Sequence, residues 1–371
     1  MTAEERWDPV TDKEKKMGTI CIKNGKIWDG ERFSRGDVYV KNEKILKIGS
    51  GIPEHADYVY DAGGKIVSAG LVDGHVHMRG ISSTQFDVQT EMSCLPFGVT
   101  AAIDASGVYG DRERLDSFMV KNRVLTSVKF KHNTADFRQA EKMLQKYGDK
   151  AVGIKVYFDT EMSEVSDSRP LKEAVDFAHS RNLLVMVHSS NSPIPMPELL
   201  ESLGKGDILT HAYHGGKNNI SEDEFECVRR AKQRGVIIDV GMAGHVHTDF
   251  RIFREAIECG AGPDVVSTDI TKWSAYKRGG RYGMTMCMSI ARTLGMSEES
   301  IFRAVTSKPA TVFGMEGEWG YLREGRCADI AVFDYTDESF YLTDKAGNQV
   351  GAPHGYRCTL TIADGEIVFR D

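Results

Sequence analysis

Eight short apolar runs recur through the middle of the chain, and they constrain its fold more than any other feature. Longer segments of helical character, such as 135–147 and 222–234, lie between them. Each run is continuously apolar, as is typical of parallel strands covered on both faces. The runs are residues 70–77, 99–104, 124–130, 151–157, 183–188, 207–211, 236–240 and 264–269. Eight strand–helix units in about 250 residues match a (β/α)₈ barrel, so we predict an α/β TIM barrel over 66–320. A doubly wound sheet is the alternative.

Both ends of the chain differ from this middle, because short strand-like stretches alternate there with turns. Asn24-Gly25 lies between two apolar stretches and is a strong hairpin signal. Since chain ends often lie close together, we expect one small β-sandwich domain built from 18–65 plus 321–371. Residues 1–17 are polar and lack the apolar core of a signal peptide, so we expect a disordered or frayed extension.

Charge and cysteine usage exclude several kinds of partner. The net charge of −7 argues against a nucleic-acid surface or an anionic membrane partner. No stretch approaches the roughly eighteen apolar residues of a membrane-spanning helix. The seven cysteines are scattered, which is typical of a reduced protein without a disulfide framework. We therefore expect a cytoplasmic protein that acts on a small molecule. Barrels of this type often associate, so a homo-oligomer fits the sequence too.

The first apolar run ends in His75 and His77. Residues two apart on a strand point to the same face, so both imidazoles can enter one pocket and bind a Zn-class ion. Alone, the pair fits two packed histidines equally well. In a barrel, however, chemistry lies at the C-terminal ends of the strands. Four other runs carry metal-capable side chains that would converge on the same mouth: Lys155, His188, His211 and Asp269.

This ordered set of side chains resembles that of the amidohydrolase superfamily, and the resemblance covers nearly the whole chain. It implies a centre of two divalent ions, Zn first and Mn as the alternative. The more buried ion would be held by His75, His77 and Asp269. The more exposed ion would be held by His188 and His211. Lys155, carrying a CO₂-derived carbamate, would bridge both, because burial beside positive charge favours the neutral, reactive amine. A plain ion pair of Lys155 is the alternative.

The chemistry implied by this centre is hydrolysis. A hydroxide that bridges two divalent ions is nucleophilic at neutral pH, because the metals lower the pKa of its water. One metal would polarise the substrate carbonyl, and Asp269 would be the catalytic residue that carries the proton to the leaving group. Deamination of a ring amine usually needs one metal and no such lysine, so it is disfavoured. A non-catalytic relative would be expected to have lost ligands, and all six are present.

Neighbouring residues indicate the substrate. The motif 73–79 resembles that of dihydroorotases, in which an arginine two residues after the second histidine binds the substrate carboxylate, and Arg79 occupies that position. The stretches 187–195 and 209–216 look more like the dihydroorotase-like deacetylase branch. We therefore favour removal of an acetyl-type group from a small carboxylate-bearing amide or ester over hydrolysis of a cyclic amide, as by dihydroorotases and hydantoinases. Other predicted substrate contacts are Tyr213, His214 and His245. A separate metal site at His245 and His247 is disfavoured, and the role of His247 stays open.

Overall fold

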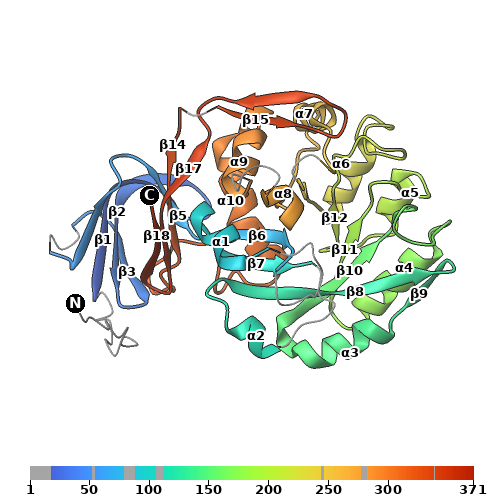
Figure 1. Ribbon diagram of the computed structural model, residues 1–371, viewed down its shortest axis with the longest axis horizontal. Helices are drawn as coiled ribbons and strands as arrows, with labels where there is room; N and C mark the ends of the chain where they lie inside the picture. The colour runs from blue at the N-terminus through green and yellow to red at the C-terminus, as the bar shows by residue number, and fades with distance from the viewer. Residues whose placement is uncertain are drawn as a thin grey trace, which may run out of the picture.

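A computed structural model describes residues 18–51, 55–78, 88–105, 112–243, 246–276, 282–337 and 339–371. Its larger part is built on a curled, parallel sheet of seven strands with helices packed outside it (Figure 1). The strands lie side by side in chain order: β6 (Leu71–Val76), β7 (Val99–Asp104), β8 (Lys121–Lys131), β10 (Ala151–Tyr157), β11 (Leu184–His188), β12 (Ile208–Thr210) and β13 (Ile237–Ile238). Seven of the eight predicted runs therefore contain a strand, and their order follows the predicted alternation.

The eighth run does not form a regular strand, although it lies between the two edges of the sheet. Single parallel bridges join Asp239 to Val265 and Val76 to Ile270. The Asp269 amide also donates to the carbonyl of His75 at 2.8 Å. A φ of 46° at Asp269 breaks the strand conformation there. The backbone of 264–270 thus connects the first strand, β6, with the last, β13, without a continuous ladder.

Helices fill the connections between the strands. They are α1 (Thr90–Cys94), α2 (Arg112–Asp116), α3 (Arg138–Tyr147), α4 (Arg169–His179), α5 (Met196–Glu201), α6 (Glu226–Gln233), α7 (Phe250–Glu258), α8 (Lys272–Tyr276), α9 (Met284–Thr293), α10 (Glu298–Val305) and α11 (Ser307–Val312), with short 3₁₀ turns at Leu95–Phe97 and Gly148–Lys150. The Asp249 carboxylate caps α7 by accepting from the amides of Arg251 and Ile252. None of the described helices is long and apolar enough to cross a membrane.

Two predicted helices begin later than their sequence patterns indicate. The pattern over 135–147 starts as β9 (Thr134–Asp136), which pairs antiparallel with the end of β8, and α3 follows it. The pattern over 222–234 starts with turns and becomes helical at Glu226, because Phe225 has a φ of 64°. In both cases, pairing or backbone geometry outside the helix determines where it begins.

Strands from both chain ends meet in a second sheet, seen beside the larger one in Figure 1. Its order is β18-β17-β14-β5-β1-β2-β3, with β4 also beside β1. The bounds are β1 (Thr19–Trp28), β2 (Phe33–Lys41), β3 (Lys44–Gly49), β4 (Tyr58–Asp61), β5 (Ile66–Ala69), β14 (Ile330–Tyr335), β17 (Tyr356–Ala363) and β18 (Glu366–Arg370). Strands of the two chain ends therefore share one connected sheet, and the predicted small β-sandwich domain is not confirmed.

A hairpin from this C-terminal part reaches across to the larger part of the molecule. It consists of β15 (Phe340–Thr343) and β16 (Gln349–Ala352), and it runs toward α7 in Figure 1. At its turn, the Asp344 carboxylate accepts from the Phe250 amide at 2.8 Å. The Lys345 amide donates to the Thr248 carbonyl at 3.4 Å. The hairpin thus anchors the residues that follow β13 and precede α7.

Candidate metal centre

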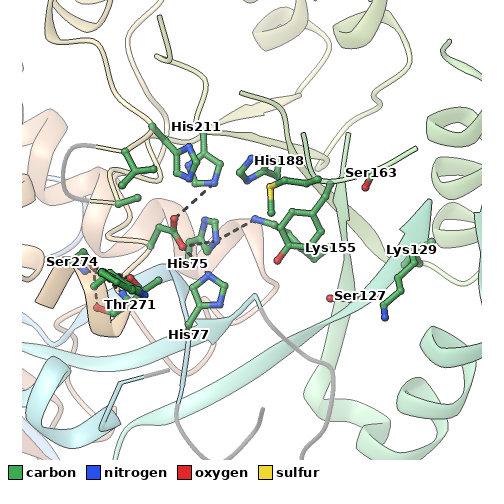
Figure 2. A pocket seen from close by; sticks show the side chains of 18 of the residues that line it. His75, His77, Ser127, Lys129, Lys155, Ser163, His188, His211, Thr271 and Ser274 are labelled. Carbon is green, nitrogen blue, oxygen red and sulfur yellow. Dashed lines mark hydrogen bonds and ion pairs between the residues drawn. The ribbon is translucent and has the colours of Figure 1, made fainter. Parts of the chain in front are cut away.

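All six predicted metal ligands line one cavity of about 900 Å³ at the C-terminal ends of the strands (Figure 2). Five of them are almost completely buried, and His77 keeps a small exposed fraction. Their separation in the sequence is large, so only the curled sheet brings them together. The ends of the strands therefore bring the six predicted ligands together around this cavity.

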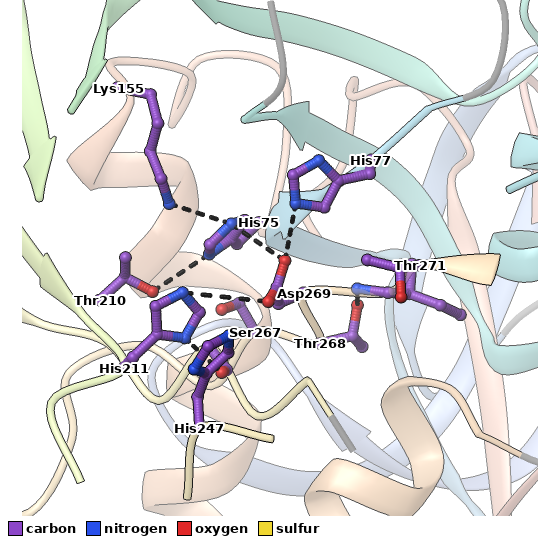
Figure 3. Close-up of polar contacts among 12 residues, drawn as sticks. His75, His77, Lys155, Thr210, His211, His247, Ser267, Thr268, Asp269 and Thr271 are labelled. Carbon is purple, nitrogen blue, oxygen red and sulfur yellow. Dashed lines mark hydrogen bonds and ion pairs between the residues drawn. The ribbon is translucent and has the colours of Figure 1, made fainter. Parts of the chain in front are cut away.

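One carboxylate joins the two histidines of the first strand. Asp269 Oδ1 lies 2.8 Å from His77 Nε2 and 3.2 Å from His75 Nε2. Burial favours the neutral carboxyl of Asp269, but the neighbouring His75 and His77 outweigh it and hold its pKa well below the usual range. The Asp269 side chain is therefore an anion, with oxygen atoms facing both imidazoles (Figure 3).

The hydrogen bonds of His75 fix which of its nitrogens can bind a metal. Its Nδ1 lies 3.1 Å from Thr210 Oγ1, and that hydroxyl donates its proton to Asp239 Oδ2 at 2.7 Å. Thr210 must then accept from His75, so Nδ1 carries the hydrogen and Nε2 carries the lone pair. A carboxylate or hydroxyl that orients a histidine in this way is the usual outer partner of a metal ligand. The pKa of His75, lowered to about 4 by burial and by Lys155, keeps the ring neutral.

His211 is oriented by the backbone. Its Nδ1 lies 2.7 Å from the carbonyl oxygen of Gly241, which can only accept, so Nε2 carries the lone pair. That Nε2 lies 3.9 Å from Asp269 Oδ2. Both residues have left-handed backbones, with φ of 58° at His211 and 46° at Asp269. Such conformations cost about 1–3 kcal/mol outside glycine and concentrate at functional sites, which is consistent with a role for both side chains.

Gly241 leaves no room for a side chain beside His211. A Cβ added there would lie 2.4 Å from Thr210 Oγ1 and 2.7 Å from His211 Nδ1, and its φ is +50°. We expect Gly241→Ala to displace both side chains and to weaken metal binding more than about tenfold, the lower range for outer partners of metal ligands. Competition with a chelator measures this. Gly260→Ala is the matched control, because its φ is +73° and nothing lies within 4 Å. It should show the backbone strain alone; equal metal affinity in both variants would contradict the role of Gly241.

Asp159 is a functional candidate that the sequence reasoning missed. It follows β10 by two residues, and its Oδ2 lies 3.5 Å from His188 Nε2. The same oxygen accepts from the Asn191 amide at 2.9 Å. Burial alone would raise the pKa of Asp159, but His188 and the backbone donors lower it well below its usual range. An ionised carboxylate thus lies beside His188 Nε2, a buried nitrogen that has no hydrogen-bond partner among the described residues. Its position just beyond a strand end was the only signal that could have found it.

The amine of Lys155 lies inside the cluster, and no carboxylate of the described residues is in hydrogen-bond contact with it. Its Nζ donates to His75 Nε2 at 3.1 Å and lies 3.5 Å from Met186 Sδ, and the residue is fully buried. Burial lowers the pKa of Lys155 to about 8, although Asp269 and Asp239 act in the opposite direction. A simple ion pair, the alternative raised by the sequence, would require a closer carboxylate. The donors present, four imidazoles and a carboxylate around this amine, suit Zn-class ions.

His247 is the second residue whose place was not predicted. Its ring centroid lies 4.2 Å from that of His211 and 4.9 Å from that of His188. It lines the same cavity, whereas the predicted substrate contact His245 lies outside the described residues, as does Arg79. The His-x-His spacing was visible in the sequence, but the path of the loop after β13 was not.

The other two predicted substrate contacts are not among the residues that line the cavity. Tyr213 is fully buried, its ring stacks on Phe253, and its hydroxyl donates to the carbonyl of Ala261 at 3.0 Å. His214 is also buried, and its Nδ1 accepts from the Gly216 amide at 3.1 Å. Both side chains therefore support the loop after β12, and their contact with a substrate stays a prediction.

Comparison with known proteins identifies the family. The model of the amidohydrolase family matches residues 66–368, so the chain belongs to this family. A deacetylase of Enterococcus faecalis is 26% identical over 369 residues, covering 94% of this chain and 98% of the relative. A dihydroorotase of Lactobacillus johnsonii is 25% identical over 429 residues, covering 95% and 99%. A solved dihydroorotase structure superposes with a TM-score of 0.82 at 23% identity, covering 95% and 98%.

Family membership and the site agree. The family is metal-dependent, and two overlapping groups of described residues have the spacing of metal ligands: His75, His211 and Asp269, and His188, His211 and His247. The chain is a hydrolase that acts on carbon–nitrogen bonds.

Proposed function

We propose that the chain is a binuclear hydrolase that removes an acetyl-type group from a small carboxylate-bearing amide or ester. The observation that carries the proposal is the meeting of five ligand-type side chains around the buried amine of Lys155. The similarity to a deacetylase over almost the full length of both chains supports the choice of an acyl substrate. The architecture proposed with it is the complete TIM barrel over 66–320 and a small domain from 18–65 plus 321–371.

The two ions, Zn²⁺ first and Mn²⁺ as the alternative, would be held by His75, His77 and Asp269 on the buried side and by His188 and His211 on the other. When bound, they supply a hydroxide at neutral pH and polarise the scissile carbonyl. Lys155 would react as the neutral amine with CO₂, forming an N–C bond and releasing one proton. The resulting carbamate is an anion that suits the space between two cations.

Asp269 would carry the proton. Its lowered pKa keeps the carboxylate ionised, so it is ready to accept a proton from the nucleophile. A proton held on so weak a base passes readily to the leaving nitrogen or oxygen. The neutral rings of His75 and His211 leave their Nε2 lone pairs for metal, and the Gly241 carbonyl keeps the His211 ring in position.

The rest of the cavity indicates where a substrate would lie. Apart from the ligands, apolar and aromatic side chains dominate its wall: Val128, Phe130, Tyr157, Met162 and Trp273. We propose that they receive the apolar part of the substrate, and that Arg79 binds its carboxylate. All seven cysteines are free thiols, which supports the proposed cytoplasmic location. A homo-oligomer remains part of the proposal.

A substrate panel tests the reaction. Protein loaded with Zn²⁺ or Mn²⁺ is expected to hydrolyse N-acetylamino acids or O-acetyl hydroxy acids faster than dihydroorotate. Arg79→Met should raise KM for carboxylate substrates at least about tenfold, since a charge-assisted, bidentate contact is lost, while metal content stays the same. The similarity to a dihydroorotase makes cyclic-amide hydrolysis the second candidate. Turnover of dihydroorotate alone would establish that candidate and reject deacetylation.

Carbamate formation gives the reconstitution of the metal-free protein a pH dependence. Only the neutral amine of Lys155 reacts with CO₂, and its pKa is about 8. Below that pH the neutral fraction falls about tenfold per unit, so at a fixed concentration of dissolved CO₂ the loading should be much slower at pH 6.5 than at pH 8.5. The activity recovered after mixing with Zn²⁺ measures the rate. A rate independent of both bicarbonate and pH would argue against the carbamate.

A further inference from the structure

His247 extends the pair of histidines proposed for the more exposed ion to a group of three. The potential ligand atoms of His188, His211 and His247 all lie within 4.8 Å of one another. The three rings come from different places in the chain: the end of β11, the residue after β12, and the loop after β13. Figure 3 shows the His247 ring beside that of His211, on the side away from Lys155.

A serine fixes the orientation of the His247 ring. Its Nδ1 lies 2.9 Å from Ser190 Oγ, and Ser190 is buried. The remaining nitrogen, Nε2, is left for another partner. Orientation of one ring nitrogen by a buried polar group is the arrangement that metal-binding histidines usually have.

The backbone next to His247 is also held in place. The Thr248 hydroxyl donates to the Met242 carbonyl at 3.3 Å, and the Asp249 amide donates to the Tyr213 carbonyl at 2.8 Å. The hairpin β15–β16 adds its bonds to Thr248 and Phe250. A ring on an anchored backbone can keep a fixed position beside His188 and His211 at a low entropic cost.

We propose that His247 is a third imidazole ligand of the more exposed metal ion. This inference rests on the proposed metal centre and adds a ligand to it. Two imidazoles and a shared carbamate leave an ion with open positions, and a third imidazole would complete a donor set typical of Zn²⁺. Imidazole-rich sites also favour Zn²⁺ over Mn²⁺, which prefers oxygen donors. His247 would therefore strengthen binding of the second ion and make it selective for Zn²⁺.

Stepwise Zn²⁺ titration of the metal-free full chain against a competing chelator tests this ligand. Wild type should bind two ions, and His247→Ala should keep the first affinity and lose at least about a hundredfold in the second, more than outer partners usually contribute. Ser190→Ala should give a smaller loss in the second affinity only. Val246→Ala, an adjacent exposed position on the same loop, is the matched control and should leave both affinities unchanged.

X-ray absorption at the zinc edge gives a readout independent of activity. The average number of imidazoles per zinc should be lower in His247→Ala than in Val246→Ala. Two ions bound with unchanged affinities in His247→Ala would overturn the inference and leave the proposed function intact. An increase in KM with unchanged metal affinities would also overturn the inference, because His247 would then contact substrate and not metal. A wild-type chain that binds only one ion would instead reject the binuclear centre, and the inference with it.

Discussion

Replacing Lys155 with alanine is expected to remove most of the bound metal and the activity with it. The side chain is fully buried and its Nζ lies 3.1 Å from His75 Nε2, so no other described group can take its place between the ligands. The loss of metal affinity should exceed about 100-fold, the upper range for outer partners of ligands. Elemental analysis after dialysis measures the metal, and an acetyl-substrate assay measures the activity.

The controls for Lys155→Ala separate its charge from its position. Lys129 lines the same cavity but is exposed and lies away from the ligands in Figure 2, so Lys129→Ala should keep its metal. The alanine also leaves a buried space, and a short carboxylate such as acetate should enter it and restore part of the metal binding, whereas an alkylamine should not. Normal metal content in Lys155→Ala would show that this amine is no ligand.

Replacing Asp269 with asparagine should reduce turnover by about 10²–10⁴-fold, the usual contribution of a positioned proton-transfer group. The amide has nearly the same shape but cannot take a proton, and it loses the charge that faces His75 and His77. At least one ion should remain bound, because His188, His211 and Lys155 are unchanged. Single-turnover kinetics on metal-loaded protein measure the chemical step.

A second carboxylate in the same segment provides the control for Asp269→Asn. Asp264 lies at the start of 264–270 and pairs with Lys232 at 3.3 Å, outside the cavity. Asp264→Asn should keep nearly normal turnover. If Asp269→Asn with full metal content also turned over normally, Asp269 would not carry the proton.

The convergence of the six predicted ligands on one cavity could be predicted from the sequence because the geometry of neighbouring parallel strands is regular. A side chain at the C-terminal end of one parallel strand is close to those at the ends of its neighbours, whatever lies between them in the chain. His188 and His211 each end an apolar run, and this position was sufficient to predict that their side chains lie at the mouth of the barrel. The position of Asp269 could be predicted in the same way. Its segment is not a regular strand, but its backbone still bridges the two edges of the sheet.

Residues that act through loop conformation could not be predicted in this way. Asp159 and Asp239 are ordinary acidic residues in the sequence. Only the folded structure shows that Asp159 lies beside His188 and that Asp239 accepts a hydrogen bond from the Thr210 hydroxyl. The His245-x-His247 spacing resembles a strand motif, but periodicity says nothing about the path of a loop. The pairing of the terminal strands was also beyond reach, since alternation marks a buried face and not the partner strand.

The most direct test of the account is the number of metal ions bound per chain. Metal-free protein incubated with excess Zn²⁺ and bicarbonate at pH 8.5, then freed of loose metal, should contain about two zinc ions per chain by elemental analysis. The proposed centre, in which six side chains including Lys155 hold the metal, predicts this number. One ion per chain, or two ions that bind equally well to Lys155→Ala, would contradict a centre bridged by this lysine.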